Sequence, residues 1–114
     1  MEPPADLGDE GLAEWERVHK VLGLRGNWRP QFWPMVTLWC STWELLVQTI
    51  NEFTDEYGGE LLLTDNRGEP YWHPALEIAD ETATSLREMA AEMLFNPEIV
   101  ERRITVVMKP FHTE

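Results

Sequence analysis

The 114-residue sequence predicts one mainly α-helical subunit with a long antiparallel helix hairpin, a short β-hairpin-like connection and a short C-terminal extended segment. Three observations predict this class. Apolar residues recur at spacings of three and four over most of the chain, which is the period of an amphipathic helix. Proline and glycine fall at the ends of these periodic stretches. Residues 60–72 break the helical period, with two short apolar runs around the polar turn "DNRG".

Two helices are predicted before this turn. The first runs from Asp9, a suitable N-cap, to Leu22, where Gly23 ends it. The second runs from near Gln31 to Tyr57, with prolines confined to its start. Its apolar residues form a heptad seam about 40 Å long, made of Phe32, Val36, Trp39, Trp43, Leu46, Ile50, Phe53 and Tyr57. A second, partly polar stripe contains Met35, Leu38, Thr42, Leu45 and Thr49. Two stripes on one helix predict a neighbouring subunit as well as an intrachain partner.

Two further helices are predicted after the turn. A third helix starts at Pro74 and packs antiparallel to the second, because its small apolar residues permit close approach. A short fourth helix starts at Pro97, and "ITVVMKPF" is interpreted as a brief strand or extended arm. The predicted organisation is therefore a disordered acidic arm over residues 1–8, a helical domain over 9–104 and an extended tail over 105–114. We expect the oligomer contacts in the second and third helices, at Trp39, Trp43, Leu46, Ile50, Phe53, Leu86 and Met89.

The net charge of −12 is unevenly distributed. An acidic body repels nucleic acid, so DNA contact would require the short basic stretches. The candidates are Arg17, Lys20, Arg25, Arg29, Arg102 and Arg103. The first four surround a glycine-bounded connector that suggests a helix-turn-helix. The alternatives are a solvated acidic surface and bases that neutralise acids on neighbouring subunits.

No residue pattern indicates catalysis. His73 has no second metal ligand at a suitable spacing, and a histidine at a helix start is more often a cap or a packed turn residue. Cys40 lies in mid-helix beside aromatic residues, where thiols are usually inert. Phosphate-binding and nucleophile motifs are missing from the sequence. We therefore expect no enzymatic activity, no metal and no cofactor.

The ordered set of motifs resembles the small subunit of phage terminases. It comprises "GLAEWERVHKVL", the aromatic "LWCSTWELL", then "HPALEIADETATSLREMAAEM" and "NPEIVERR", and it spans about Gly11 to Ile104. Phe95 stands where the family has a glycine-containing turn. The resemblance implies a helical subunit of an oligomeric ring in the cytoplasm of the infected bacterial host.

The same resemblance implies partners. It implies a non-catalytic subunit that binds viral double-stranded DNA and modulates a large subunit bearing ATPase and nuclease activities. Partner contact near a terminus would use Val106, Val107 and Phe111, or these residues would pack on their own subunit. The rival interpretation is an acidic helical adaptor or inhibitor that binds another protein without DNA, and a hydrolase using His73 is the third.

Overall fold

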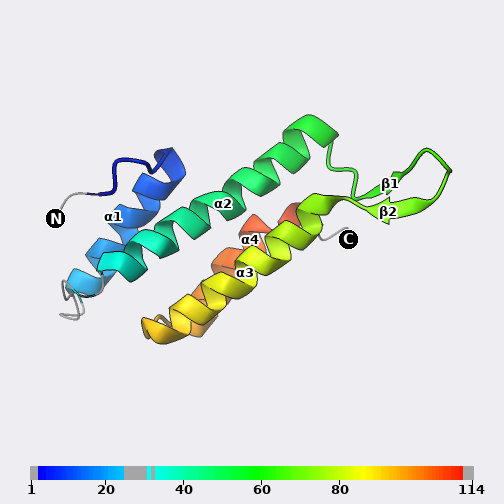
Figure 1. The fold of residues 1–114 in the computed structure, drawn as a ribbon. Helices are drawn as coiled ribbons and strands as arrows, with labels where there is room; N and C mark the ends of the chain where they lie inside the picture. The colour runs from blue at the N-terminus through cyan, green and yellow to red at the C-terminus, as the bar shows by residue number, and fades with distance from the viewer. Residues whose placement is uncertain (1–2, 25–30, 32, 112–114) are drawn as a thin grey trace. The chain divides into compact units, whose positions relative to one another are not determined.

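The structure is a computed structural model that describes residues 3–24, 31 and 33–111. The described chain contains the helices α1 to α4, one β-hairpin and a short 3₁₀ helix, as Figure 1 shows. It divides into two compact units, Met1–Leu45 and Leu46–Glu114, and α2 contributes to both. The mainly helical class with a small antiparallel hairpin is therefore confirmed.

The first unit is built from α1 (Asp9–Leu24) and the first part of α2. The predicted first helix is confirmed, and it continues two residues beyond Leu22, so Gly23 does not end it. Asp9 and Glu10 occupy the first turn, where negative charge interacts favourably with the helix dipole. The buried face carries Gly11, Glu14, Trp15, Val18 and Leu22. One carboxylate thus lies among the apolar residues of this face.

Helix α2 (Trp33–Tyr57) follows the predicted seam. The seam residues Val36, Trp39, Trp43, Leu46, Ile50 and Phe53 are all buried, as expected for positions that recur every three or four residues. Two glycines with positive φ, Gly58 and Gly59, end the helix, and the Gly59 N–H donates to the Phe53 carbonyl at 3.2 Å. This bond joins residues six apart and satisfies one of the carbonyls at the C-terminal end of the helix.

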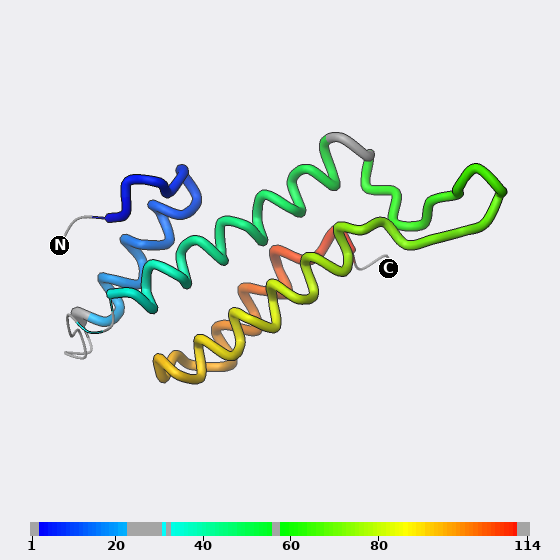
Figure 2. The backbone as a smooth tube through the Cα atoms, viewed as in Figure 1, coloured from blue at the N-terminus to red at the C-terminus, as the bar shows by residue number. Residues whose placement is uncertain are grey.

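The second unit begins its β-hairpin after this cap, with β1 (Leu62–Thr64) and β2 (Pro70–Trp72) antiparallel. The predicted turn is confirmed: one Asp65 carboxylate oxygen accepts from the backbone N–H groups of Arg67 and Glu69, at 2.8 and 2.9 Å. Gly68 supplies the positive φ that the turn requires. The chain then passes from β2 directly into α3, as the tube in Figure 2 shows.

Helices α3 (Pro74–Glu92) and α4 (Pro97–Val107) pack together in the second unit. The buried face of α3 is rich in alanine, which lets α4 approach closely. Between the helices, Leu94 adopts a φ of 58°, a conformation that favours glycine. Asn96 caps α4 by accepting from the N–H of Glu98 at 2.9 Å. Within this unit, the C-terminal part of α2 and α3 run in opposite directions (Figure 1).

The predicted C-terminal extended segment is wrong. Helix α4 continues to Val107, and a 3₁₀ helix, η2 (Lys109–Phe111), follows it. The β-branched run "ITVV" favours a strand locally, but burial at helical spacing decides the outcome. The buried residues of this segment are Val100, Ile104, Met108 and Phe111, whose spacings of four and three place them on one face of a helix.

Candidate nucleic-acid and assembly surfaces

The described basic residues of the first unit lie on α1. Arg17 is half-exposed, and its guanidinium donates to the Glu14 carboxylate at 3.0 Å. Lys20, one turn further, is exposed. The positive charge of Arg17 is therefore already paired with an acid on its own helix, which leaves less of it for contact with DNA. Arg25, Arg29 and the connector of the predicted helix-turn-helix lie outside the described residues, so that motif stays a prediction.

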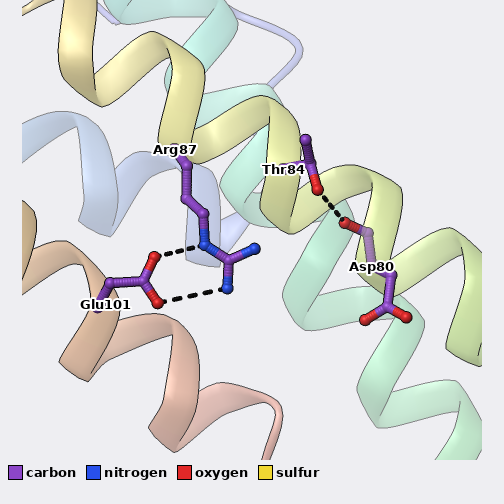
Figure 3. Close-up of polar contacts among 4 residues, drawn as sticks. All are labelled: Asp80, Thr84, Arg87 and Glu101. Atoms are coloured by element: carbon purple, nitrogen blue, oxygen red, sulfur yellow. Dashed lines mark hydrogen bonds and ion pairs between the residues drawn. The ribbon is translucent and has the colours of Figure 1, made fainter.

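The basic residues of the second unit lie mainly on α4. Arg102 is exposed and Arg103 is half-buried. Arg87 on α3 pairs with Glu101 on α4 through two nitrogens, one of them at 3.4 Å, as the close-up in Figure 3 shows. Both side chains of that pair are substantially exposed, so solvent screens it and its contribution to stability is small. Arg102 therefore presents the clearest positive charge on α4.

The seven residues predicted to form the oligomer interface are all buried in the single chain. Their packing is aromatic: the rings of Trp39 and Trp43 stack with centroids 6.5 Å apart, and Phe53 lies 4.7 Å from Phe111. Their role in an interface stays a prediction. A neighbouring subunit would first meet the exposed residues around them.

The second stripe of α2 supplies such exposed residues. Leu38 and Leu45 are 56% and 48% exposed, and they lie two helical turns apart on one face. From residue 33 to residue 51 the sequence of α2 contains one charged side chain, Glu44. An uncharged helix face with exposed leucines is typical of a contact surface and unusual for a solvated one.

The C-terminal end of the second unit also exposes some apolar surface. Val106 on α4 is exposed, Val107 is half-buried, and Phe111 is buried against Phe53 of the same chain. Of the three residues predicted to bind a partner, Val106 therefore offers the largest exposed side chain. The partner role of all three stays a prediction.

His73 has a structural role. Its Nδ1 accepts from the Ala75 N–H at 3.0 Å, which makes it the N-cap of α3. Its ring lies edge-on to Phe53, with centroids 5.1 Å apart, and its backbone N–H donates to the Leu61 carbonyl at 2.7 Å. The predicted capping and packing role is confirmed. One residue thus ties the base of the hairpin, the start of α3 and the end of α2 together.

Cys40 is fully buried in α2. Burial, together with the smaller effect of the negative charges of Glu14 and Glu44, raises the pKa of its thiol to about 12. A thiol with such a pKa stays protonated at neutral pH and is a poor nucleophile. In the parts of the chain that the structure describes, no three His, Cys, Asp or Glu side chains form a group that could hold a metal ion.

Two acidic residues that join the helices of the first unit were not anticipated. The buried Glu14 carboxylate accepts from the Trp39 indole N–H at 2.6 Å, and Glu44 accepts from the Gly11 N–H at 2.9 Å. A Cβ at Gly11 would lie 2.9 Å from the Glu44 carboxylate, so the glycine makes room for this contact. The sequence signal for Glu14 is its position four residues before Val18, on the edge of the apolar face.

No described helix is long and apolar enough to cross a membrane. Comparison with curated proteins and with solved structures gives no match. A family model described as "Phage terminase, small subunit" matches residues 11–107, which is most of the chain. The chain therefore belongs to the phage terminase small subunit family, and its role is in phage genome packaging.

Proposed function

We propose that this chain is the non-catalytic DNA-recognition and regulatory subunit of a viral terminase. It acts in the cytoplasm of the infected bacterial host, binds viral double-stranded DNA as a ring and modulates the large ATPase and nuclease subunit. The observation that carries the proposal is the family match over residues 11–107. Surfaces of the structure support two parts of the proposal, assembly and DNA contact.

Assembly is supported by the uncharged stripe of α2. Leu38 and Leu45 expose apolar surface on a chain whose net charge of −12 otherwise opposes contact between copies. A second copy that covered these leucines would bury apolar area without desolvating a charge. The seven buried residues of the helical core would support this contact from within the subunit.

DNA contact is supported by Lys20 on α1 and by the bases that follow it in the sequence. Lys20 is exposed, and Arg25 and Arg29 follow it closely in the sequence. Each copy offers few cations, so useful affinity requires several copies acting on one DNA molecule. Such binding falls steeply with salt, because each phosphate contact releases counterions.

The acidic surface favours a second candidate function, an adaptor or inhibitor that binds a protein partner without DNA. The exposed acids of α3 are Glu77, Asp80, Glu81, Glu88 and Glu92. The one base of this helix, Arg87, is already paired with Glu101. An acidic helix face of this kind suits a basic protein surface better than a phosphate backbone.

DNA binding across a salt series separates the two functions. The terminase function predicts that fluorescence anisotropy with double-stranded DNA gives a linear log–log salt dependence. Lys20→Ala reduces the slope by about one for each copy in contact with DNA, and the triple variant Lys20→Ala, Arg25→Ala and Arg29→Ala reduces it further. Lys109→Ala, which removes an exposed lysine from η2, is the matched control and leaves the slope unchanged.

An unchanged slope in the triple variant would exclude this DNA site. Salt-independent or undetectable DNA binding by the wild-type protein, together with stimulation or inhibition of the large subunit's ATPase, would instead establish the adaptor. The DNA titration therefore separates the terminase function from the adaptor function. The ATPase assay of the large subunit shows in both cases that the protein is active.

A further inference from the structure

We propose that the β-hairpin of one copy docks on the exposed face of α4 in the next copy of this chain. The inference deepens the proposed ring assembly and rests on it. It concerns two surfaces of the second unit, which we define as the hairpin surface, Leu62 and Trp72, and the α4 surface, Ile99, Arg102 and Val106.

The hairpin surface is an apolar pair on one face of the two strands. Leu62 lies opposite Trp72 in the register, and these side chains are 55% and 61% exposed. The Asp65–Glu69 and Leu61–His73 pairs carry backbone hydrogen bonds, at 2.9 and 2.7 Å. Because hydrogen-bonded pairs alternate with other pairs along an antiparallel ladder, Leu62 and Trp72 form a non-hydrogen-bonded pair, whose side chains lie closest together.

The hairpin has little to stabilise it in its own chain. Each strand has three residues, and a two-stranded hairpin is marginally stable in water unless one face is packed. Its direction is nevertheless fixed at the base, because His73 is held by Phe53 and by the first turn of α3. The hairpin therefore presents its apolar pair from a preorganised base, which lowers the entropy that docking would cost.

The α4 surface lies on the side of that helix away from its own core. Val100, Ile104 and Met108 face the interior, whereas Ile99 and Val106 are 52% and 67% exposed. These two residues are seven apart, so they share a face, and Arg102 lies between them on that face. Arg102 makes no ion pair with any side chain in the described chain. Along the helix, the α4 surface therefore presents an apolar, then a basic, then a second apolar side chain.

The two surfaces are complementary in charge as well as in polarity. The hairpin segment carries Glu60, Asp65 and Glu69 against one base, Arg67. Asp65 is engaged in the turn, but Glu60 and Glu69 are exposed. An arginine between two apolar residues suits an exposed indole on an acidic hairpin, since guanidinium groups are attracted both to carboxylates and to aromatic faces. Contact at this point also relieves the repulsion expected between acidic copies.

The occupant must be another copy and not the same chain. The hairpin extends beyond the N-terminal end of α3, away from the middle of α4, in both ribbon and tube (Figures 1 and 2). Contact between two different surfaces is heterologous, and a heterologous contact generates a closed ring when the rotation between neighbouring copies closes on itself. This assigns Arg102 to the subunit contact and leaves Lys20 and the bases that follow it in the sequence for DNA.

Two complementary variants test the contact in the full-length protein. The hairpin variant carries Leu62→Ser and Trp72→Ser, and the α4 variant carries Ile99→Ser and Val106→Ser. All four side chains are exposed, so we expect both variants to fold, and circular dichroism checks this. A matched control carries Val21→Ser and Ile78→Ser, which replace exposed apolar residues elsewhere.

Native mass spectrometry then gives distinct results. We expect an oligomer for the wild type and the control, and monomers for each variant alone, with self-association weakened by about a hundredfold or more. An equimolar mixture of the two variants should form a 1:1 heterodimer and stop there, because that pair retains one intact contact. Arg102→Glu should weaken assembly more than Arg102→Leu, because it places an acid opposite the acidic hairpin.

Failure of the proposed assembly and failure of the hairpin–α4 contact give different results. A wild-type monomer at micromolar concentration would overturn the proposed assembly itself. A wild-type oligomer whose size is unchanged in both variants would overturn only the hairpin–α4 contact, and so would assembly by one variant but not the other. Intact oligomers that no longer stimulate the large subunit's ATPase would show that these surfaces bind that subunit instead, which also overturns the contact.

Discussion

The buried hydrogen bond between α1 and α2 makes the sharpest prediction about stability. Glu14→Met keeps the length of the side chain but removes the acceptor of the Trp39 indole N–H, which now lies 2.6 Å from the carboxylate. Both residues are about 1% exposed, so water cannot replace the lost acceptor. We expect the free energy of unfolding to fall by about 1.5–3 kcal/mol, the usual range for a hydrogen bond to a charged group.

The double variant separates the hydrogen bond from the packing. Trp39→Phe removes the indole N–H, so adding it to Glu14→Met leaves no unpaired donor, and apolar groups then face each other. The coupling energy from the double-mutant cycle should be about 1.5–3 kcal/mol. Arg17→Met is the matched control. It removes the half-exposed partner of the same carboxylate, and it should cost less than about 1 kcal/mol because solvent screens that pair.

Urea unfolding followed by far-ultraviolet circular dichroism measures these differences without relying on tryptophan fluorescence, which Trp39→Phe would alter. A coupling energy below about 0.5 kcal/mol would mean that the two side chains act independently. It would refute the conclusion that this buried acid joins α1 to α2. A control effect as large as that of Glu14→Met would refute the assignment of the cost to the buried bond.

Three further predictions concern single positions. Cys40 should resist thiol reagents at pH 8 in the folded protein but not in urea, because burial raises its pKa from 9.0 to about 12. The unfolded thiol ionises first, so stability should fall as the pH rises from about 9 towards 12, and Cys40→Val should abolish that loss. His73→Ala should lower the free energy of unfolding by about 1–2 kcal/mol through loss of the α3 cap, and His73→Asn, which keeps an acceptor, should lower it less. Leu94→Gly should raise the thermal midpoint by relieving a φ of 58°, with a gain of about 0.5–1 kcal/mol, whereas Leu94→Ala should give no such gain.

Local patterns in the sequence predict most of the fold. The seam of α2, the turn of the hairpin and the cap of α3 each depend on residues close together in the chain: apolar spacing, Asp65 with Gly68, and His73 before Pro74. The C-terminal segment was predicted wrongly because its β-branched residues favour a strand. Its helix is instead stabilised by burial of Ile104 against the rest of the second unit and by contact of Phe111 with Phe53.

The candidate surfaces are harder to predict than the fold. A seam residue such as Trp43 is buried whether its partner is the same chain or another copy, so periodicity alone cannot assign it to an interface. The pairing of Arg17 with Glu14, and the burial of Glu14 beneath Trp39, depend on which face of α1 meets α2. Exposure of Leu38 and Trp72 likewise follows only from the packed structure.

The assembled state of the wild-type protein tests the central claim most directly, because a packaging subunit with few cations per copy needs several copies to hold DNA. Native mass spectrometry over a range of micromolar concentrations should show one oligomer with a fixed number of subunits, and the same number of subunits should be present when double-stranded DNA is bound. A stable monomer across the same range, with or without DNA, would contradict the account.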